Sequence, residues 1–273
     1  MMRQGSGMDM MKGRLAIAVL IALFSLCSYY SSSQKNPVTG EVQHIGSITP
    51  AQEVQMGLQA LPQMLQEFRG ESRDARATQL VKEVGAELVR NSVAAQSDYR
   101  FDFHLLADRD TVNAFALPGG QVFITECLLG KLESQAQLAG VLGHEIGHVL
   151  ARHGAERMAK QQLTQGLTGA AVMASGSQNS AQLAMMVGNM INMKYGREDE
   201  LESDKLGLQF MVDSGYDPRS MIGVMEILER ATGGGRGQPE FMSTHPNPGN
   251  RIGHIKEHIR EMFPNGLPAN LRQ

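Results

Sequence analysis

The sequence contains no tryptophan and only two cysteines among its 273 residues, and aromatic residues make up 5% of it. Two cysteines, Cys27 and Cys127, cannot build the disulfide framework of a small secreted domain. No block of basic residues stands out and the formal charge is −3, so we expect no nucleic-acid partner. A hydrophobic content of 42% and a charged content of 19% are typical of a globular protein.

The long apolar run at the N-terminus predicts a targeting segment. Lys12 and Arg14 precede the run Leu15 to Cys27, and serine-rich polar sequence follows it. The run is short for a membrane span and is typical of the apolar region of a signal peptide. We therefore expect residues 1–27 to be a signal peptide and the protein to be exported to the periplasm. The alternative is a short buried helix.

Cys27 has two interpretations. It could be the lipid-bearing first residue of a bacterial lipoprotein, which would anchor the protein to the outer membrane. Alternatively it is only the last residue of the apolar run, because Leu26 precedes it where lipoprotein signals prefer a small residue. Residues 28–48 lack periodicity and are interpreted as a tether.

The rest of the chain predicts an α+β, mostly helical fold with a small sheet beside a central helix. We expect a single domain over residues 49–263 and a C-terminal tail over 264–273. Thr49, Pro50 and Gln52 resemble the start of a capped helix. Alternating apolar residues predict a strand at 101–105, and residues 112–116 and 121–125 are two further strand candidates. The 3.6-residue periodicity predicts helices near 49–68, 76–93, 134–154, 156–172, 181–195, 197–214, 218–231 and 250–262.

His144, Glu145 and His148 carry the main chemical signal. Residues four apart on a helix share one face, so His144 and His148 can bind one zinc ion. Glu145 lies about 100° around the helix, beside the metal, where a general base is needed. The flanking residues are apolar or glycine, which indicates a buried helix. The pattern predicts one catalytic Zn²⁺ per chain.

A catalytic zinc needs a third protein ligand, and spacing alone does not identify it. Gly154 stands where a metzincin has its third histidine, so that class is excluded. His153 is five residues after His148 and is expected to face elsewhere as a packing or exposed residue. The acidic cluster that follows offers Glu200, with Glu198 and Glu202 as rivals. His254 and His258 form a second pair, interpreted as a solvated helix face.

Six stretches of the chain resemble the HtpX/LoiP/BepA type of gluzincin metallopeptidases, which are related to the CAAX prenyl proteases. The resemblance implies that Glu200 is the third zinc ligand and that Asp204 accepts a hydrogen bond from the other ring N–H of a zinc-binding histidine. Ser203 stands where the family usually has alanine. The resemblance also implies an active-site role for His245 and Arg251, either of which could hold the oxyanion. The matching stretches are NPVTG, NAFALPGGQVFIT, GHEIGHVLARHGAER, REDELESDKLG, GYDPRSM and STHPNPGNRI.

A substrate-binding edge is expected where the second strand of a predicted pair begins. Gly119, Gly120, Gln121, Val122 and Phe123 are interpreted as an edge strand that pairs with a peptide backbone. Such binding tolerates many sequences and would suit unfolded proteins. The alternative is an ordinary strand of the sheet.

Two functional hypotheses follow. The first is a zinc endopeptidase of the bacterial envelope that hydrolyses unfolded or misassembled proteins, with Glu145 as the base. The second is a chaperone-like envelope protein with a silent or gated zinc site. The glycines before His245 suggest a hinged loop, in which His245 could occupy the water position on zinc or stabilise the oxyanion. The complete set of His144, Glu145, His148 and Glu200 favours the enzyme.

Overall fold

The computed structural model describes residues 5–46, 48–175, 195–232, 240–245 and 250–273. These residues form an α+β fold that is mostly helical, as predicted, with two small sheets. The chain divides into two compact units, one of residues 1–48 and 155–194 and the other of residues 49–154 and 195–273. This division differs from the predicted domain boundaries, which assign 155–194 to the catalytic domain. The predicted helix over 181–195 lies outside the described residues, apart from Tyr195.

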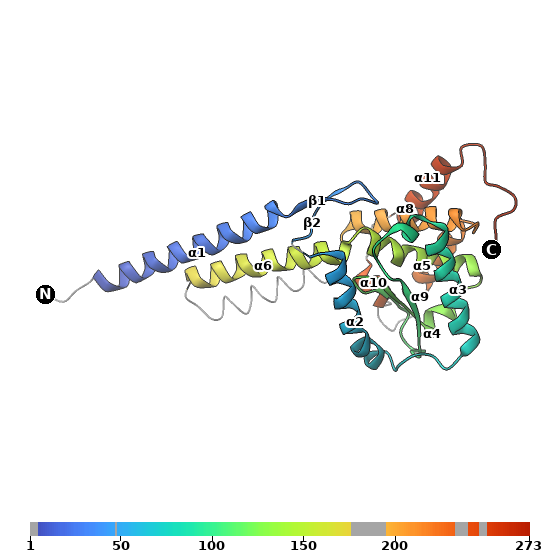
Figure 1. Cartoon of the computed structure of the whole chain (residues 1–273), viewed down its shortest axis with the longest axis horizontal. Helices are drawn as coiled ribbons and strands as arrows, with labels where there is room; N and C mark the ends of the chain where they lie inside the picture. The colour runs from blue at the N-terminus through green and yellow to red at the C-terminus, as the bar shows by residue number, and fades with distance from the viewer. Residues whose placement is uncertain (1–4, 47, 176–194, 233–239, 246–249) are drawn as a thin grey trace. The chain divides into compact units, whose positions relative to one another are not determined.

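The N-terminal unit begins with helix α1 (Gly5–Ser31), which is longer than the predicted apolar run. Its segment Met11–Ser31 is long and apolar enough to cross a membrane, and a signal sequence at an N-terminus meets the same criteria. Cys27 is exposed on this helix and forms no disulfide. The same unit contains most of helix α6 (His153–Ser175), drawn in yellow-green in Figure 1.

The predicted tether contains a hairpin, which corrects that expectation. Strands β1 (Ser33–Lys35) and β2 (Val42–His44) pair antiparallel. Asn36 closes the turn, because its side-chain oxygen accepts hydrogen bonds from the backbone N–H groups of Val38 and Thr39 at 2.8 and 3.2 Å. The strands have three residues each, too few for a period-two pattern to be recognised in the sequence.

The second unit contains a three-stranded sheet with the order β3-β5-β4. Its strands are β3 (Asp102–Leu106), β4 (Ala114–Ala116) and β5 (Gln121–Thr125). Strand β5 pairs parallel with β3 and antiparallel with β4, and all of its residues are buried. The prediction that Gln121, Val122 and Phe123 form an edge strand is therefore wrong. The continuous apolar run from Val122 to Ile124 in β5 is typical of a strand covered on both faces.

Gly119 and Gly120 lie in the turn before β5, and both have a positive φ, 85° and 109°. A side chain on Gly119 would lie 2.3 Å from the Val54 Cα, so glycine is required there for two reasons. Val54 belongs to helix α2 (Pro50–Glu67), which has the predicted capping box between Thr49 and Gln52. The turn is thus fixed against α2 and is not an open edge.

The centre of this unit is helix α5 (Gln135–Leu150), in which only Gln135 is not buried. Ser134 caps it by accepting a hydrogen bond from the Gln137 N–H. Helix α8 (Arg197–Asp213) packs along α5, and β4 also contacts α5 (Figure 1). The other helical elements among the described residues of this unit are α3 (Ala75–Asn91), η1 (Val93–Gln96), α4 (Glu126–Leu129), α9 (Ser220–Thr232), α10 (Glu240–Thr244) and α11 (Arg251–Met262).

Close contact between α5 and α8 depends on glycine. Gly143 and Gly207 face each other, and a methyl group on Gly207 would lie 2.9 Å from the backbone nitrogen of His144. Gly147 similarly lies against Ser203 of α8. Small residues at these positions let the two helices approach closely enough for side chains of both to meet at one point. The first turn of α8 therefore lies beside His144 and His148.

Candidate active site

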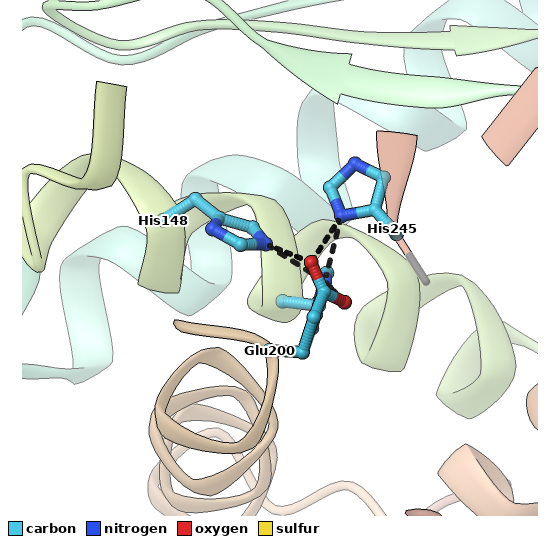
Figure 2. Close-up of side chains that lie close together, drawn as sticks. His148, Glu200 and His245 are labelled. Carbon is cyan, nitrogen blue, oxygen red and sulfur yellow. Dashed lines mark hydrogen bonds and ion pairs between the residues drawn. The ribbon is translucent and has the colours of Figure 1, made fainter. Parts of the chain in front are cut away.

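Four ligand atoms converge where α5, α8 and the residue after α10 meet. One ligand atom from each of His144, His148, Glu200 and His245 lies within 4.8 Å of the others. The Nε2 atoms of His144 and His148 are 3.0 Å apart, and each lies 3.5 Å from a carboxylate oxygen of Glu200. His245 Nδ1 lies 3.0 Å from Glu200 Oε1 (Figure 2). All four residues are at most 2% exposed.

Glu145 lies beside this cluster, as its helical position predicts. It is fully buried, and neither of its carboxylate oxygens has a hydrogen-bond partner among the described residues. Its nearest ionisable partner is His245, whose Nε2 atom is 3.7 Å from Glu145 Oε1. A buried carboxylate without a partner is costly in a purely structural role, which favours a chemical one.

A buried ion-pair network lies behind the ligands. His144 Nδ1 lies 3.0 Å from Asp204 Oδ1, the contact that fixes the tautomer of a metal-binding histidine. Arg251 donates two hydrogen bonds to Asp204, from Nε and from an Nη, at 2.6 and 2.7 Å. Its other Nη lies 3.0 Å from Glu200 Oε2. The guanidinium thus contacts carboxylates through all three nitrogens.

His245 follows α10, whose residue Phe241 stacks on its ring at a centroid distance of 4.5 Å. The backbone N–H of His245 donates a hydrogen bond to the Phe241 carbonyl. These contacts hold the imidazole in the ligand cluster. The glycines expected to form the hinge, residues 233–237, lie outside the described residues.

Burial and charge shift the pKa values of this cluster in opposite directions. Burial raises the pKa of Glu145 and lowers that of His148 well below its usual value. Burial and Arg251 oppose the protonation of His144, but hydrogen bonds to Asp204 and Glu200 outweigh them and raise its pKa to about 9. Burial also opposes the ionisation of Glu200, but the neighbouring histidines, His245 first, hold its pKa well below the usual range.

Comparison with known proteins agrees with this geometry. The model of peptidase family M48 matches residues 75–259, which is more than half of the chain. The chain belongs to peptidase family M48.

Curated relatives come from bacteria and eukaryotes. The β-barrel assembly-enhancing protease of Escherichia coli strain K12 is 31% identical over 232 residues, covering 80% of this chain and 46% of that protein. The mitochondrial metalloendopeptidase OMA1 of Schizosaccharomyces pombe is 34% identical over 172 residues, covering 62% of this chain and 50% of that protein. The chain spans about half the length of the curated relatives it matches.

The ligand set of this M48 chain fits zinc. Two imidazoles and one carboxylate are the donors of a gluzincin-type site, and their ligand atoms converge here. Of the acids that spacing left open, the structure brings Glu200 into the cluster, whereas Glu198 is exposed and Glu202 points toward His153. Among the described residues, this is the only place where three or more His, Cys, Asp or Glu side chains bring their ligand atoms together closely enough to hold a metal ion.

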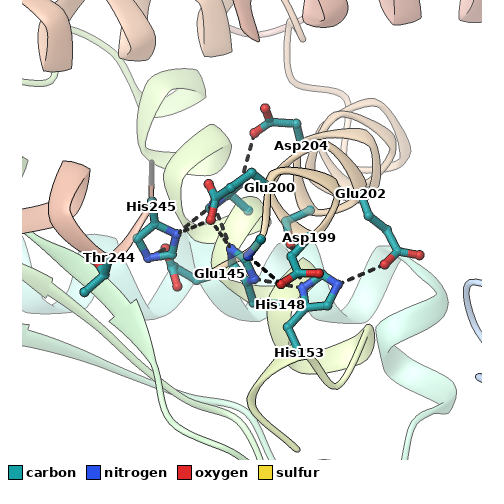
Figure 3. Close-up of polar contacts among 12 residues, drawn as sticks. Glu145, His148, His153, Asp199, Glu200, Glu202, Asp204, Thr244 and His245 are labelled. Atoms are coloured by element: carbon teal, nitrogen blue, oxygen red, sulfur yellow. Dashed lines mark hydrogen bonds and ion pairs between the residues drawn. The ribbon is translucent and has the colours of Figure 1, made fainter. Parts of the chain in front are cut away.

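His153 is buried, which agrees with the predicted packing role, but it faces His148 and not another side of the helix as predicted. It is 1% exposed, and its Nδ1 atom lies 2.9 Å from His148 Nδ1 (Figure 3). Helical spacing misplaced this residue because α5 ends at Leu150 and α6 begins at His153, with Arg152 between them at a φ of 57°. A left-handed arginine is not visible in a periodicity pattern. As predicted, His254 is exposed, and His258 is partly exposed.

Tyr195 was also missed as a contact of the site. Its ring stacks on His148 with a centroid distance of 3.9 Å and an interplanar angle of 24°. It lies just before α8 and is 7% exposed. No sequence pattern marks it, because the position depends on how the chain enters α8.

Proposed function

We propose that this protein is a zinc-dependent endopeptidase of the bacterial cell envelope that hydrolyses unfolded or misassembled proteins. One observation carries the proposal: His144, His148 and Glu200 converge beside Glu145, whose two oxygens have no partner among the described residues. That arrangement combines a metal site with an available base. Membership of family M48 supports the same reaction class.

Each residue has a distinct part in the proposed reaction. Zinc bound by His144, His148 and Glu200 would polarise the scissile carbonyl and lower the pKa of a water molecule. Glu145 takes the proton of that water and later delivers it to the leaving amine. Its raised pKa suits both steps, because a more basic carboxylate accepts a proton more readily. Asp204 and Arg251 hold His144 and Glu200 in place.

The substrate backbone is proposed to pair with β4 rather than with β5. Among the described strands, β4 (Ala114–Ala116) pairs only with β5, so its other side is an edge. The strand also contacts α5, which carries the zinc ligands. Backbone pairing gives affinity without a strict sequence requirement, and extended, unfolded segments can reach such an edge.

His245 is proposed to restrain the enzyme. It supplies a fourth ligand atom to the cluster and so would occupy the position that the catalytic water needs. A protease with a sequence-tolerant edge endangers folded neighbours, and this arrangement would keep it inactive until His245 moves. The same observation supports the second candidate function, a chaperone-like protein whose zinc site stays closed.

The proposed location is the periplasm, with attachment to the outer membrane through a lipidated Cys27. The name of the Escherichia coli relative refers to β-barrel assembly, which suggests clients of the outer membrane. Cys27 is exposed at the end of the apolar run. Mass spectrometry of the protein from its native envelope should show a mature N-terminus at Cys27 carrying acyl chains. An intact N-terminus at Met1 or Met11 would contradict processing.

The activity is tested by comparing the wild type with Glu145→Gln on an unfolded substrate such as casein. The variant should retain about one zinc per chain, because Glu145 is not a ligand, and lose at least about 100-fold in turnover. A chelator should abolish the wild-type activity, and added zinc should restore it. Undiminished cleavage by Glu145→Gln would contradict the role of the base. Zinc-loaded protein that binds unfolded clients without cleaving them would favour the chaperone.

A further inference from the structure

His148 has a chain of polar partners behind it that leads to a different acid from the one behind His144. His148 Nδ1 lies 2.9 Å from His153 Nδ1, and His153 Nε2 lies 2.9 Å from Glu202 Oε2. Figure 3 shows the three side chains in this order, on the side of His148 away from Glu200. His148 and His153 are at most 2% exposed, and the Glu202 side chain is 23% exposed.

Two imidazole nitrogens at 2.9 Å require one donor and one acceptor. His148 faces Glu200 and His144 through Nε2, so a metal there is bound through Nε2 and the remaining proton of the neutral ring is on Nδ1. His153 Nδ1 must then accept that proton's hydrogen bond. A neutral His153 consequently carries its own proton on Nε2, directed at the Glu202 carboxylate.

We propose that His153 and Glu202 are positioning residues that fix the tautomer and ring orientation of His148 for zinc. The hydrogen bonds run from His148 Nδ1–H to His153 Nδ1, and from His153 Nε2–H to Glu202 Oε2. Glu202, which spacing offered as a rival ligand, therefore acts on the metal site indirectly, through His153 and His148. The proposal rests on the zinc site of the proposed function, but zinc affinity can be measured whether or not the protein cleaves peptides.

Ser203 provides the competing arrangement. Its hydroxyl oxygen lies 3.3 Å from the same His153 Nδ1 atom. If that nitrogen carried the proton, His153 would donate to Ser203 and could not accept from His148. The shorter distance to His148, and the carboxylate facing His153 Nε2, both favour the proposed tautomer.

The decisive measurement is nitrogen NMR of the zinc-loaded protein labelled at histidine. Long-range proton–nitrogen spectra distinguish a protonated from an unprotonated ring nitrogen. We expect His148 to be protonated at Nδ1 and His153 at Nε2. A proton on His153 Nδ1 would overturn the proposal, because it removes the acceptor that His148 needs.

Variants test the consequence for metal binding, measured by competition with a chromogenic zinc chelator. His153→Leu removes the acceptor and should weaken zinc binding by about 10–100-fold, the usual effect of losing an outer partner of a metal ligand. His153→Asn places an oxygen near the position of Nδ1 and should recover most of that loss. Glu202→Gln should weaken zinc by a smaller factor, because the amide oxygen still accepts from His153.

Two controls separate positioning from general damage to the fold. Glu198→Gln changes an exposed acid in the first turn of the same helix, and Ser203→Ala removes the competing hydroxyl. Both should bind zinc within about threefold of the wild type. Wild-type zinc affinity in His153→Leu, or no recovery in His153→Asn when both variants are folded, would refute the proposal. If His153→Leu does not fold, Glu202→Gln and the NMR spectrum of the wild type still decide it.

Discussion

At the scale of single residues, the acids of α8 differ in surroundings although they share one helix. Glu200 is fully buried within the ligand cluster, and Asp204 is 3% exposed between His144 and Arg251. Glu198 is exposed. Burial of a carboxylate is unfavourable unless cations or donors compensate it, so the two buried acids have roles that an exposed acid lacks.

The loss of zinc affinity on substitution should be largest for the most buried of these acids and smallest for the exposed one. Glu200→Gln removes a charged ligand and should weaken zinc most. Asp204→Asn should weaken it by about 10–100-fold, because it disturbs the partner of His144 but no ligand. Glu198→Gln should have no effect. Chelator competition on the purified variants measures the order, and equal affinities for wild type and Glu200→Gln would move the third ligand elsewhere.

At the scale of elements, periodicity predicted the long helices well and the short elements poorly. The helices at 135–150, 197–213 and 251–262 agree with the predictions to within a few residues, because each has a buried face and a clear boundary. The hairpin β1–β2 and helix α10 were not predicted, since elements of three to five residues carry too little periodic signal.

The candidate site was predictable in part. The spacing of His144, Glu145 and His148 indicated the metal and the base without a structure. The choice of Glu200 over Glu198 needed the family resemblance, because three glutamates occur within one turn and a half of helix. His153 could not be placed, because its position depends on a turn in the backbone at Arg152 rather than on helical spacing.

The packing of α5 on α8 gives a testable requirement for glycine. Gly207→Ala would bring a methyl group within 2.9 Å of the His144 backbone, so the helices must separate. We expect a loss of about 1–3 kcal/mol in the free energy of unfolding, together with weaker zinc binding. Gly169→Ala in α6, where no described residue lies within 4 Å of an added methyl group, should be neutral or stabilise by about 0.5–1 kcal/mol. Urea unfolding of both variants tests the contrast, and an equally stable Gly207→Ala protein would contradict it.

The two roles considered for His245, which follows α10, predict opposite effects of His245→Ala on activity. If His245 restrains the enzyme, His245→Ala should cleave unfolded casein faster than the wild type while keeping its zinc, because three protein ligands remain. If His245 instead stabilises the oxyanion, the variant should lose about 10²–10³-fold in rate. We expect the increase. Steady-state rates with zinc content measured in parallel decide between them, and unchanged rates would leave His245 a packing residue.

At the scale of the whole molecule, the last described residues pack on the second unit, which contains the candidate active site, and do not form a free tail. Arg272 donates a hydrogen bond to Glu87 of α3 at 2.8 Å, and its guanidinium lies 4.1 Å from the centroid of the Tyr216 ring. Tyr216 also donates a hydrogen bond to Glu87 at 2.8 Å. The segment predicted as a tail therefore joins residues that are far apart in the sequence.

The contacts of Glu87 with Arg272 and Tyr216 predict that the stability of the protein depends on pH. Burial opposes the ionisation of Glu87, but the hydrogen bonds from Arg272 and Tyr216 outweigh it and lower its pKa. A folded-state pKa below the unfolded value means that ionised Glu87 stabilises the protein above about pH 4 to 5, and that this contribution disappears as the pH falls through the folded-state pKa. Glu87→Gln should therefore be less stable than the wild type at pH 7, with a difference that shrinks in acid.

Exposed Glu83 on the same helix provides the control, since Glu83→Gln should change stability little at either pH. Urea unfolding of the three proteins from pH 7 to pH 3 measures the effect. A difference between Glu87→Gln and the wild type that stays constant across this range would show that Glu87 acts by packing rather than by its charge.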